Sequence, residues 1–212
     1  MDRTRPSSDA LGFDKPDYSY PHTLENGGGE RIVFERKVQG AAGERLEGYN
    51  VVSPGAGPPM HVHFLQEEAL TVVHGRMGYQ RPGGPEHFAG PGESVVFKAG
   101  DAHRFWNAGD TELRCTAYIE PAHNVEFFLG AIFESTRRTG GQRPDPFDAA
   151  FLITRYRTEF AMLEIPPIVQ RLVFPALVAV GRLLGKYEKY RDAPEPIRGG
   201  RPIEVASRYA AE

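Results

Sequence analysis

Short segments rich in Val, Phe, Tyr and Thr alternate with clusters of Gly and Pro from about residue 31 to residue 121. The clusters read GGGE, SPGAGPP, RPGGPE, AGPGE, KAGD and NAGD. Turn signals about every 8 to 12 residues, between segments with strand-forming side chains, are typical of an all-β sandwich or barrel. We therefore predict that this part of the chain folds into several short strands.

The pattern of apolar residues changes after Pro121. The segments NVEFFLGAIFESTRR, DPFDAAFLITRYRTEFAM and PPIVQRLVFPALVAVGRLLGKY carry apolar side chains three and four residues apart, a spacing that predicts helices. Pro175 lies inside the last segment, and we expect a kink or break there because proline lacks the amide hydrogen that a helix uses.

The length of 212 residues allows one sizeable core, or a domain of about 120 to 150 residues with an appendage. The strand and helix patterns divide the chain accordingly. We predict an extended N-terminal arm over residues 1–30, a β domain over residues 31–121, and a helical extension over residues 122–212. The extension is expected to pack on the β domain or on a partner subunit.

The charge balance and the single cysteine exclude several classes of function. The chain has 25 Lys and Arg against 28 Asp and Glu, a formal charge of -3, and no segment is basic enough to indicate nucleic-acid binding. Cys115 is the only cysteine, which excludes an intrachain disulfide framework and a multi-cysteine zinc site. A lone cysteine fits a reducing compartment, so we expect a cytoplasmic protein.

Neither end of the chain predicts a membrane anchor. The N-terminal segment has no apolar run after its charged residues, and so it does not resemble a signal peptide. The apolar segment near the C-terminus is interrupted by Arg171, Pro175 and Arg182, well short of the ~20 apolar residues that a membrane span needs. We expect a buried or interfacial helix and no membrane binding.

The stretch HVHFLQEE, residues 61–68, combines two histidines with two adjacent carboxylates. Residues two apart on a strand point to the same face, so His61 and His63 share a face, as do Glu68, Leu70 and Val72. Two neutral imidazoles and one carboxylate suit a divalent ion of Fe, Mn, Co, Ni, Cu or Zn.

A further candidate ligand follows the turn at Gly100 and Asp101. His103 opens a predicted strand on which His103, Phe105 and Asn107 face one way. For a single histidine, a structural role would be the better interpretation. Several metal-binding residue types that share strand faces instead favour a metal site.

These segments resemble the two motifs of the cupin superfamily. The first motif, glycine, His-X-His, glutamate and glycine, is matched by Gly55, His61, His63, Glu68 and Gly75. The second is matched by Gly92, Lys98-Ala99-Gly100, His103 and Asn107, with Lys98 in place of the usual proline. The match covers roughly residues 31–121.

The resemblance implies an antiparallel β-barrel of the jelly-roll type, with C-terminal helices, that binds one divalent metal ion. The implied ligands are His61, His63, Glu68 and His103, and iron is the preferred ion among those above. Gly75 lies seven residues after Glu68, which is the spacing of the family. If Glu68 points inward, strand alternation turns Glu67 outward. We therefore expect Glu68 to be the ligand.

Four further residues could form an apolar substrate pocket above the metal: Leu70, Val72, Tyr79 and Phe105. Aromatic side chains on the inner face of a barrel are as readily explained as core, so both interpretations stay open.

The implied function is a mononuclear metal dioxygenase, similar to the quercetinase-like cupins, that acts on a small enolic or aromatic substrate. Glu68 would also accept a proton from a substrate hydroxyl group. The alternatives are a metal-dependent isomerase or lyase, which would need inward cationic groups, and a non-enzymatic cupin that binds a small molecule. Because cupins are commonly dimers, the resemblance also implies a homodimer.

Overall fold

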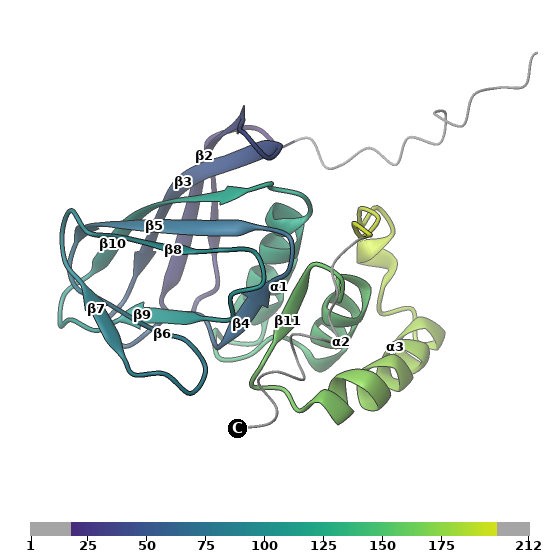
Figure 1. Cartoon of the computed structure of the whole chain (residues 1–212). Helices are drawn as coiled ribbons and strands as arrows, with labels where there is room; N and C mark the ends of the chain where they lie inside the picture. The colour runs from purple at the N-terminus through teal and green to yellow at the C-terminus, as the bar shows by residue number, and fades with distance from the viewer. Residues whose placement is uncertain (1–17, 199–212) are drawn as a thin grey trace, which may run out of the picture.

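The computed structural model describes residues 18–198 and shows strands followed by helices (Figure 1). The largest sheet has six strands. In spatial order they are β1 (His22–Glu25), β2 (Glu30–Gln39), β3 (Glu44–Val52), β10 (Leu113–Glu120), β5 (Glu67–His74) and β8 (Ser94–Phe97). Every pairing in this sheet is antiparallel.

The remaining strands form two smaller antiparallel sheets. One contains β7 (His87–Ala89), β6 (Met77–Gln80) and β9 (Arg104–Asn107), and the other contains β11 (Phe160–Met162) and β4 (His61–His63). The prediction of a mainly β, antiparallel fold with C-terminal helices is confirmed. A closed barrel is not shown, because the strands between residues 18 and 198 pair into three separate sheets.

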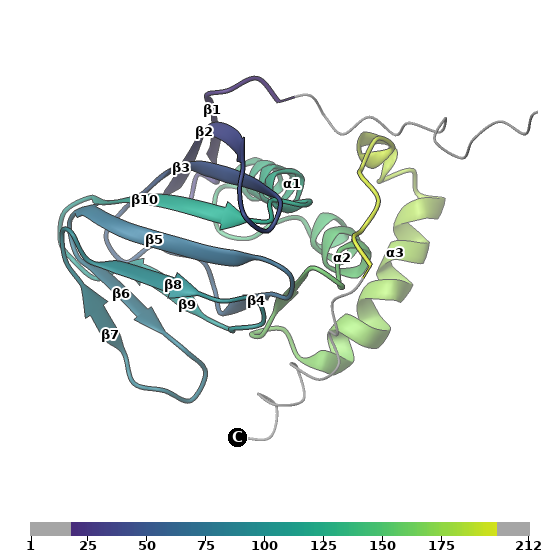
Figure 2. The same cartoon turned by 45° about the horizontal axis from the view of Figure 1, so that its top comes forward.

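The first apolar core lies between the six-stranded and the three-stranded sheet, which face each other in Figure 2. Its buried side chains come from both sheets, and they include Val52, Leu70, Val72, Met77, Phe97, Phe105, Leu113 and Cys115. Inward-facing residues alternate along each strand, as expected where one face of a sheet is covered. Cys115 is fully buried in this core, where it serves as a small apolar side chain.

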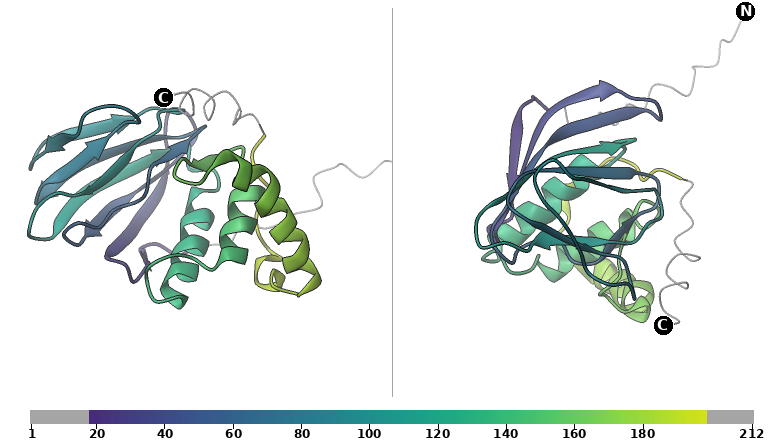
Figure 3. Two further views of the ribbon diagram at one scale, coloured as in Figure 1. Left: turned by 90° about the horizontal axis from the view of Figure 1, so that it is seen from below. Right: turned by 60° about the vertical axis from the view of Figure 1, so that its left-hand side comes forward.

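Three helices lie at one end of the sheets, with α3 farthest from them (Figure 3). They are α1 (Val125–Arg138), α2 (Pro146–Arg155) and α3 (Phe174–Leu183). The Asp145 side chain caps α2 by accepting hydrogen bonds from the backbone of Phe147 and Asp148, which satisfies amide groups that have no partner inside the helix.

A second core joins the helices to the β domain. Phe34, Leu46 and Ile119 of the large sheet pack in one buried cluster with Val125 and Phe128 of α1, Phe151 and Leu152 of α2, and Phe160 of β11. The helical extension is predicted to pack on the β domain or on a partner subunit, and within this chain it packs on the β domain.

Two segments differ from the sequence prediction. The segment DPFDAAFLITRYRTEFAM is predicted to be a helix, but α2 ends at Arg155 and Phe160–Met162 forms strand β11. Residues 1–30 are predicted to form an extended arm, yet β1 lies within them and pairs with β2 in register His22 with Phe34; residues 1–17 lie outside the described part of the chain. At the predicted kink or break near Pro175, the π-helix η1 (Val169–Val173) passes directly into α3 and the backbone stays helical, so only the type of helix changes there. Proline fits there because its missing amide hydrogen is tolerated in the first turn of a helix.

The surface of η1 and α3 that faces away from the protein is apolar. Six large apolar side chains are exposed there: Ile168, Leu172, Val173, Val180, Leu183 and Leu184. Even so, none of the helices within residues 18–198 has the length and hydropathy needed to cross a membrane.

Candidate metal centre

Backbone pairing brings the two sequence motifs together. His61 and His63 lie on β4, Glu68 lies on β5, and His103 directly precedes β9. The backbone amide of His61 donates to the carbonyl of His103 at 2.9 Å, and the amide of His103 donates to the carbonyl of His61 at 2.8 Å. This reciprocal pair fixes two imidazoles side by side although about 40 residues separate them in the chain.

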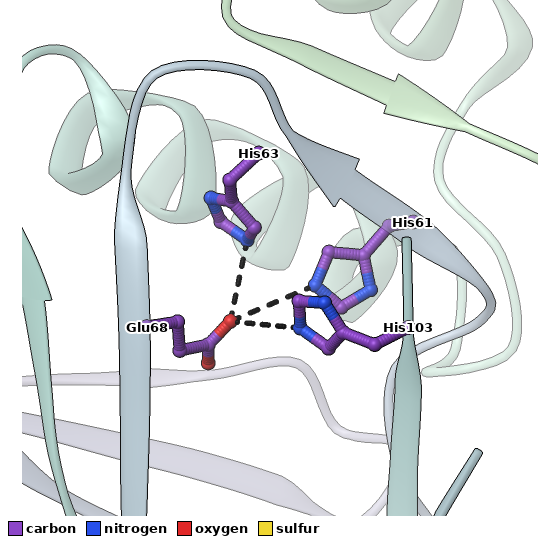
Figure 4. Close-up of side chains that lie close together, drawn as sticks. All are labelled: His61, His63, Glu68 and His103. Carbon is purple, nitrogen blue, oxygen red and sulfur yellow. Dashed lines mark hydrogen bonds and ion pairs between the residues drawn. The ribbon is translucent and has the colours of Figure 1, made fainter. Parts of the chain in front are cut away.

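The four side chains converge on one point (Figure 4). Their potential ligand atoms all lie within 4.8 Å of one another. The Glu68 Oε2 atom is 3.1 Å from Nε2 of His103, 3.4 Å from Nε2 of His63 and 3.9 Å from Nε2 of His61. Such a cluster of three imidazoles around one carboxylate is a candidate metal site.

Hydrogen bonds to the backbone orient two of the imidazoles. Nδ1 of His61 lies 2.8 Å from the carbonyl oxygen of Pro59, and Nδ1 of His103 lies 2.9 Å from that of Asp101. A ring nitrogen can only donate to a carbonyl, so the hydrogen sits on Nδ1 and the Nε2 lone pair is left for a metal. Phe97 stacks on the His103 ring at 3.7 Å between centroids, which restrains the ring further.

The charges of the cluster fit a cation. Burial alone would raise the pKa of Glu68, but the surrounding imidazoles of His103, His61 and His63 hold it well below its usual range. Burial, together with the charges of His61 and His103, lowers the pKa of His63 to about 3 despite the opposing charge of Glu68. An ionised carboxylate and a neutral imidazole are the forms that bind metals.

The short contacts around Glu68 call for positive charge. An ionised Oε2 atom and the lone pair of an Nε2 atom repel each other, so protons or one cation must lie between them. Three imidazole nitrogens and one carboxylate are a suitable set for a borderline divalent ion, which would keep a net charge of +1. His61, His63, Glu68 and His103 thus fit one divalent transition metal, whose identity the donor set leaves open.

The structure separates the two glutamates of HVHFLQEE. The Oε1 atom of Glu67 accepts a hydrogen bond of 2.7 Å from the hydroxyl group of Tyr118, whereas Glu68 points at the histidines. Residues 67 and 68 are adjacent on β5 and so face opposite sides of the sheet.

A cavity of about 90 Å³ adjoins the histidine cluster and extends between the large sheet and α1. His61, His63 and Glu68 form part of its wall, and most of the remaining wall is apolar. Other lining residues include Glu30, Ile32, Phe34, Asn50, Phe105 and Phe133. The four donors therefore lie beside a space that can hold a small molecule.

Only one of the four predicted pocket residues lines this cavity. Phe105 does so, whereas Leu70, Val72 and Tyr79 are not part of the lining; Leu70 and Val72 belong to the core between the sheets, and Tyr79 packs against it. Leu70 and Val72 do share the face of Glu68, but they lie about 7 and 13 Å farther along a strand that rises ~3.3 Å per residue. The cavity extends in another direction, toward β2 and β3.

Sequence reasoning missed two polar residues of the cavity wall, Glu30 on β2 and Asn50 on β3. A signal was present, because Glu30 lies in period-two register with Ile32 and Phe34, and Asn50 with Leu46 and Val52. A polar residue in register with core residues is an informative exception.

Residues 48–119 match the family model described as a cupin domain. This segment of the chain is a cupin domain. It contains all four donors, so the candidate metal site lies within the cupin domain. A search of curated proteins finds no match to the sequence.

Solved structures similar to this chain carry several different descriptions. They include a sugar phosphate isomerase from Silicibacter pomeroyi (21% identity, TM-score 0.37, 44% of this chain and 60% of that one). A protein with a double-stranded β-helix domain from Klebsiella pneumoniae has 18% identity, a TM-score of 0.38, and coverage of 54% and 91%. A predicted oxalate decarboxylase from Thermotoga maritima has 19% identity, a TM-score of 0.38, and coverage of 47% and 90%.

Proposed function

We propose that this cupin is a metal-dependent dioxygenase that acts on a small, uncharged enolic or aromatic molecule. The observation that carries the proposal is the composition of the cavity beside the four donors. Within residues 18–198, no Lys or Arg lines the cavity, and its wall is mostly apolar with Phe34, Phe105 and Phe133 among its side chains. An apolar wall with few polar groups is typical of a site for a small organic ligand.

The same cavity disfavours the isomerase or lyase alternative for anionic substrates. Phosphate and carboxylate groups are usually held by Arg or Lys, whereas the charged groups of this wall include two carboxylates, Glu30 and Glu68. Arg76 and Arg104, the cations nearest to the motifs in sequence, lie elsewhere: Arg76 over the ring of Phe88 and Arg104 over that of Trp106. The cavity wall therefore offers a phosphate or carboxylate group no Lys or Arg partner within residues 18–198.

A bound divalent transition metal would supply Lewis-acid chemistry and a site where an organic substrate and dioxygen meet. The chain's own residues would bind and orient the substrate. Glu68 directs Oε2 at the imidazoles while its other oxygen points away from them (Figure 4). That second oxygen is proposed to accept the proton of a substrate hydroxyl group. Phe105 and Phe133 would exclude water from the reacting end.

The dioxygenase proposal is tested by elemental analysis followed by oxygen uptake. Protein purified without added metal is expected to contain about one equivalent of a transition metal. It should then consume dioxygen with at least one member of a panel of enolic and phenolic compounds, measured with an oxygen electrode. The matched control is the same protein after treatment with a chelator.

Two results would count against the proposal. Protein without bound metal would exclude a metal dioxygenase. Metal-loaded protein that consumes no dioxygen with any compound of the panel would favour the isomerase, lyase or binding alternatives.

The predictions about partners and location stay proposals: a small-molecule substrate, no nucleic acid, no membrane, a homodimer and a cytoplasmic location. For the homodimer, the exposed apolar surface of η1 and α3 is the proposed interface. Exposed apolar surface of this kind commonly marks an interaction site.

Sedimentation velocity measures the proposed dimer directly. The 23.5 kDa chain is expected to sediment with twice that mass. The double variant Leu172→Ser, Leu183→Ser is expected to sediment with the mass of one chain, because the interface loses two exposed leucines. Val73→Ser removes an exposed apolar side chain from β5 and should leave the mass unchanged. A parent protein that sediments as a monomer would contradict the prediction.

A further inference from the structure

Besides the metal-site residues, the mostly apolar wall of the cavity contains two polar side chains on neighbouring strands. Glu30 on β2 is paired in register with Val52 of β3, and Asn50 of β3 is paired with Ile32 of β2. Glu30 and Asn50 are therefore diagonal neighbours on one face, with Cβ atoms on the order of 7 to 8 Å apart. Both line the cavity that His61, His63 and Glu68 also line.

Asn50 has hydrogen-bonding capacity that the fold leaves unused. Its side chain is only 7% exposed, yet its amide oxygen, Oδ1, has no hydrogen-bond partner within the described residues. A buried amide oxygen without a hydrogen bond destabilises the fold. Such a group in a cavity wall calls for a partner from outside the fold.

Glu30 is held in place but keeps an oxygen available. Its Oε2 atom accepts a hydrogen bond of 2.7 Å from the side-chain amide of Asn26, and Asn26 in turn accepts from the backbone of Gly28 and Glu30. This local turn network orients the carboxyl group. Within residues 18–198, the one hydrogen bond to the carboxyl group goes to Oε2, and Oε1 receives none.

The protonation of Glu30 is consistent with binding to a neutral partner. Burial raises the pKa of Glu30 to about 7, although the hydrogen bond from Asn26 and the charge of His61 both lower it. Near neutral pH the carboxyl group can therefore either accept or donate a hydrogen bond. A structural role in the turn would explain the contact of Glu30 with Asn26, but it would leave the unpaired amide of Asn50 without an explanation.

We propose that Glu30 and Asn50 form a polar subsite that binds a hydroxyl group on the end of the substrate remote from the metal. The inference rests on the proposed function, because it takes the cavity as the substrate site. It narrows the substrate class to small neutral molecules with an enolic oxygen at one end, an apolar or aromatic middle and a hydroxyl group at the other end. Glu30 and Asn50 would thus determine specificity, while the four donors hold the reacting end.

A matched pair of ligands tests the subsite without turnover. Kojic acid is a neutral hydroxypyranone that binds divalent metals through its enol and carbonyl oxygens, and it carries a hydroxymethyl group on the other side of the ring. Allomaltol is the same molecule with a methyl group there. Affinities of both for the zinc-loaded protein would be measured by titration calorimetry, since zinc undergoes no redox change.

The parent protein is expected to bind kojic acid about 10-fold more tightly than allomaltol, the effect of a hydrogen bond to a buried polar group. In Asn50→Leu the ratio should fall toward about one, because the buried acceptor oxygen is removed. In Glu30→Gln it should fall by a smaller factor, because the amide can still form a hydrogen bond but cannot carry a negative charge. The affinity for allomaltol and the zinc content should stay unchanged. Glu30→Gln keeps the shape of the side chain, and circular dichroism of both variants verifies the fold.

The outcomes separate the subsite from the site as a whole. If the parent binds both compounds equally, or if the affinity ratio is unchanged in both variants, the proposed subsite is contradicted. The proposal that the cavity beside the metal binds the substrate is then unaffected. If the zinc-loaded parent binds neither compound, the cavity is not the substrate site, and the proposed function and the subsite fail together.

Discussion

Replacing His103 by Ala is expected to lower the affinity of the protein for its divalent metal by at least about 100-fold. Mutating a residue that only orients a metal ligand already lowers metal affinity roughly 10- to 100-fold, and loss of a ligand itself should cost at least as much. The Nε2 atom of His103 is the closest imidazole atom to Glu68 Oε2, at 3.1 Å. Its removal leaves two imidazoles and one carboxylate. Elemental analysis after dialysis, followed by titration with zinc, measures the loss.

His74→Ala is the matched control for this experiment. His74 ends β5, the strand that carries Glu68, but its side chain is exposed and is not part of the cluster. Its removal should change neither metal content nor affinity. If His103→Ala binds zinc as tightly as the parent does, His103 is not a ligand, and the cluster is an arrangement of buried histidines around a carboxylate.

The candidate donors could be predicted from sequence because their arrangement depends on local rules. Strand alternation places His61 and His63 on one face and separates Glu67 from Glu68. The glycines of the motifs mark turns that other residues rarely form: Gly75 and Gly100 both have φ of 86°, a conformation that favours glycine. Such positions constrain the strands on either side, so the spacing of the motif carries structural information.

The departure from the motif at Lys98 also has a local explanation. The backbone amide of Lys98 donates to the carboxylate of Asp101 at 3.3 Å, and the amide of Asp101 donates to the Lys98 carbonyl at 2.9 Å. A proline at this position would fix the backbone through its ring but would lack the first of these hydrogen bonds. The turn before His103 is thus held by hydrogen bonds.

The wall of the cavity could not be predicted in the same way, because it depends on how distant elements pack. Ile32 and Phe34 come from β2, and Phe133 comes from α1, a helix that covers the cavity from far along the chain. Alternation shows which residues share a face, but it does not show which part of that face remains open. Leu70 and Val72 share the face of Glu68, as alternation predicts, but they lie in the part of that face that the core fills.

The C-terminal helices show the same division between local and long-range information. Apolar spacing predicts α1, α2 and α3, and the position of Pro175 predicts where the last helix changes. Buried polar contacts fix the position of the segment after α2. These contacts leave no periodic pattern in the sequence, so the sequence does not predict them. Glu159 is the main example, since its carboxylate connects segments that are far apart in sequence.

Glu159→Ala is expected to lower the free energy of unfolding by about 3 to 5 kcal/mol, because two buried donors and one partly buried donor lose their acceptor. Glu159 has no exposed surface. Its carboxylate accepts from the side chain of Asn124 at 2.7 Å, from the backbone of Asn124 at 3.3 Å and from the backbone of Ile197 at 2.9 Å. These bonds join the start of α1 to the C-terminal segment.

Urea denaturation followed by circular dichroism measures this loss, which would be a large share of the roughly 5 to 15 kcal/mol typical of a folded domain. Glu159→Gln retains one acceptor oxygen and should lose less, because part of the network survives. Glu188→Ala removes an exposed carboxylate and should shift stability by less than about 0.5 kcal/mol. If Glu159→Ala unfolds at the same urea concentration as Glu188→Ala, the buried network does not stabilise the extension, and the apolar contacts of α1 and α2 with the sheet must do so alone.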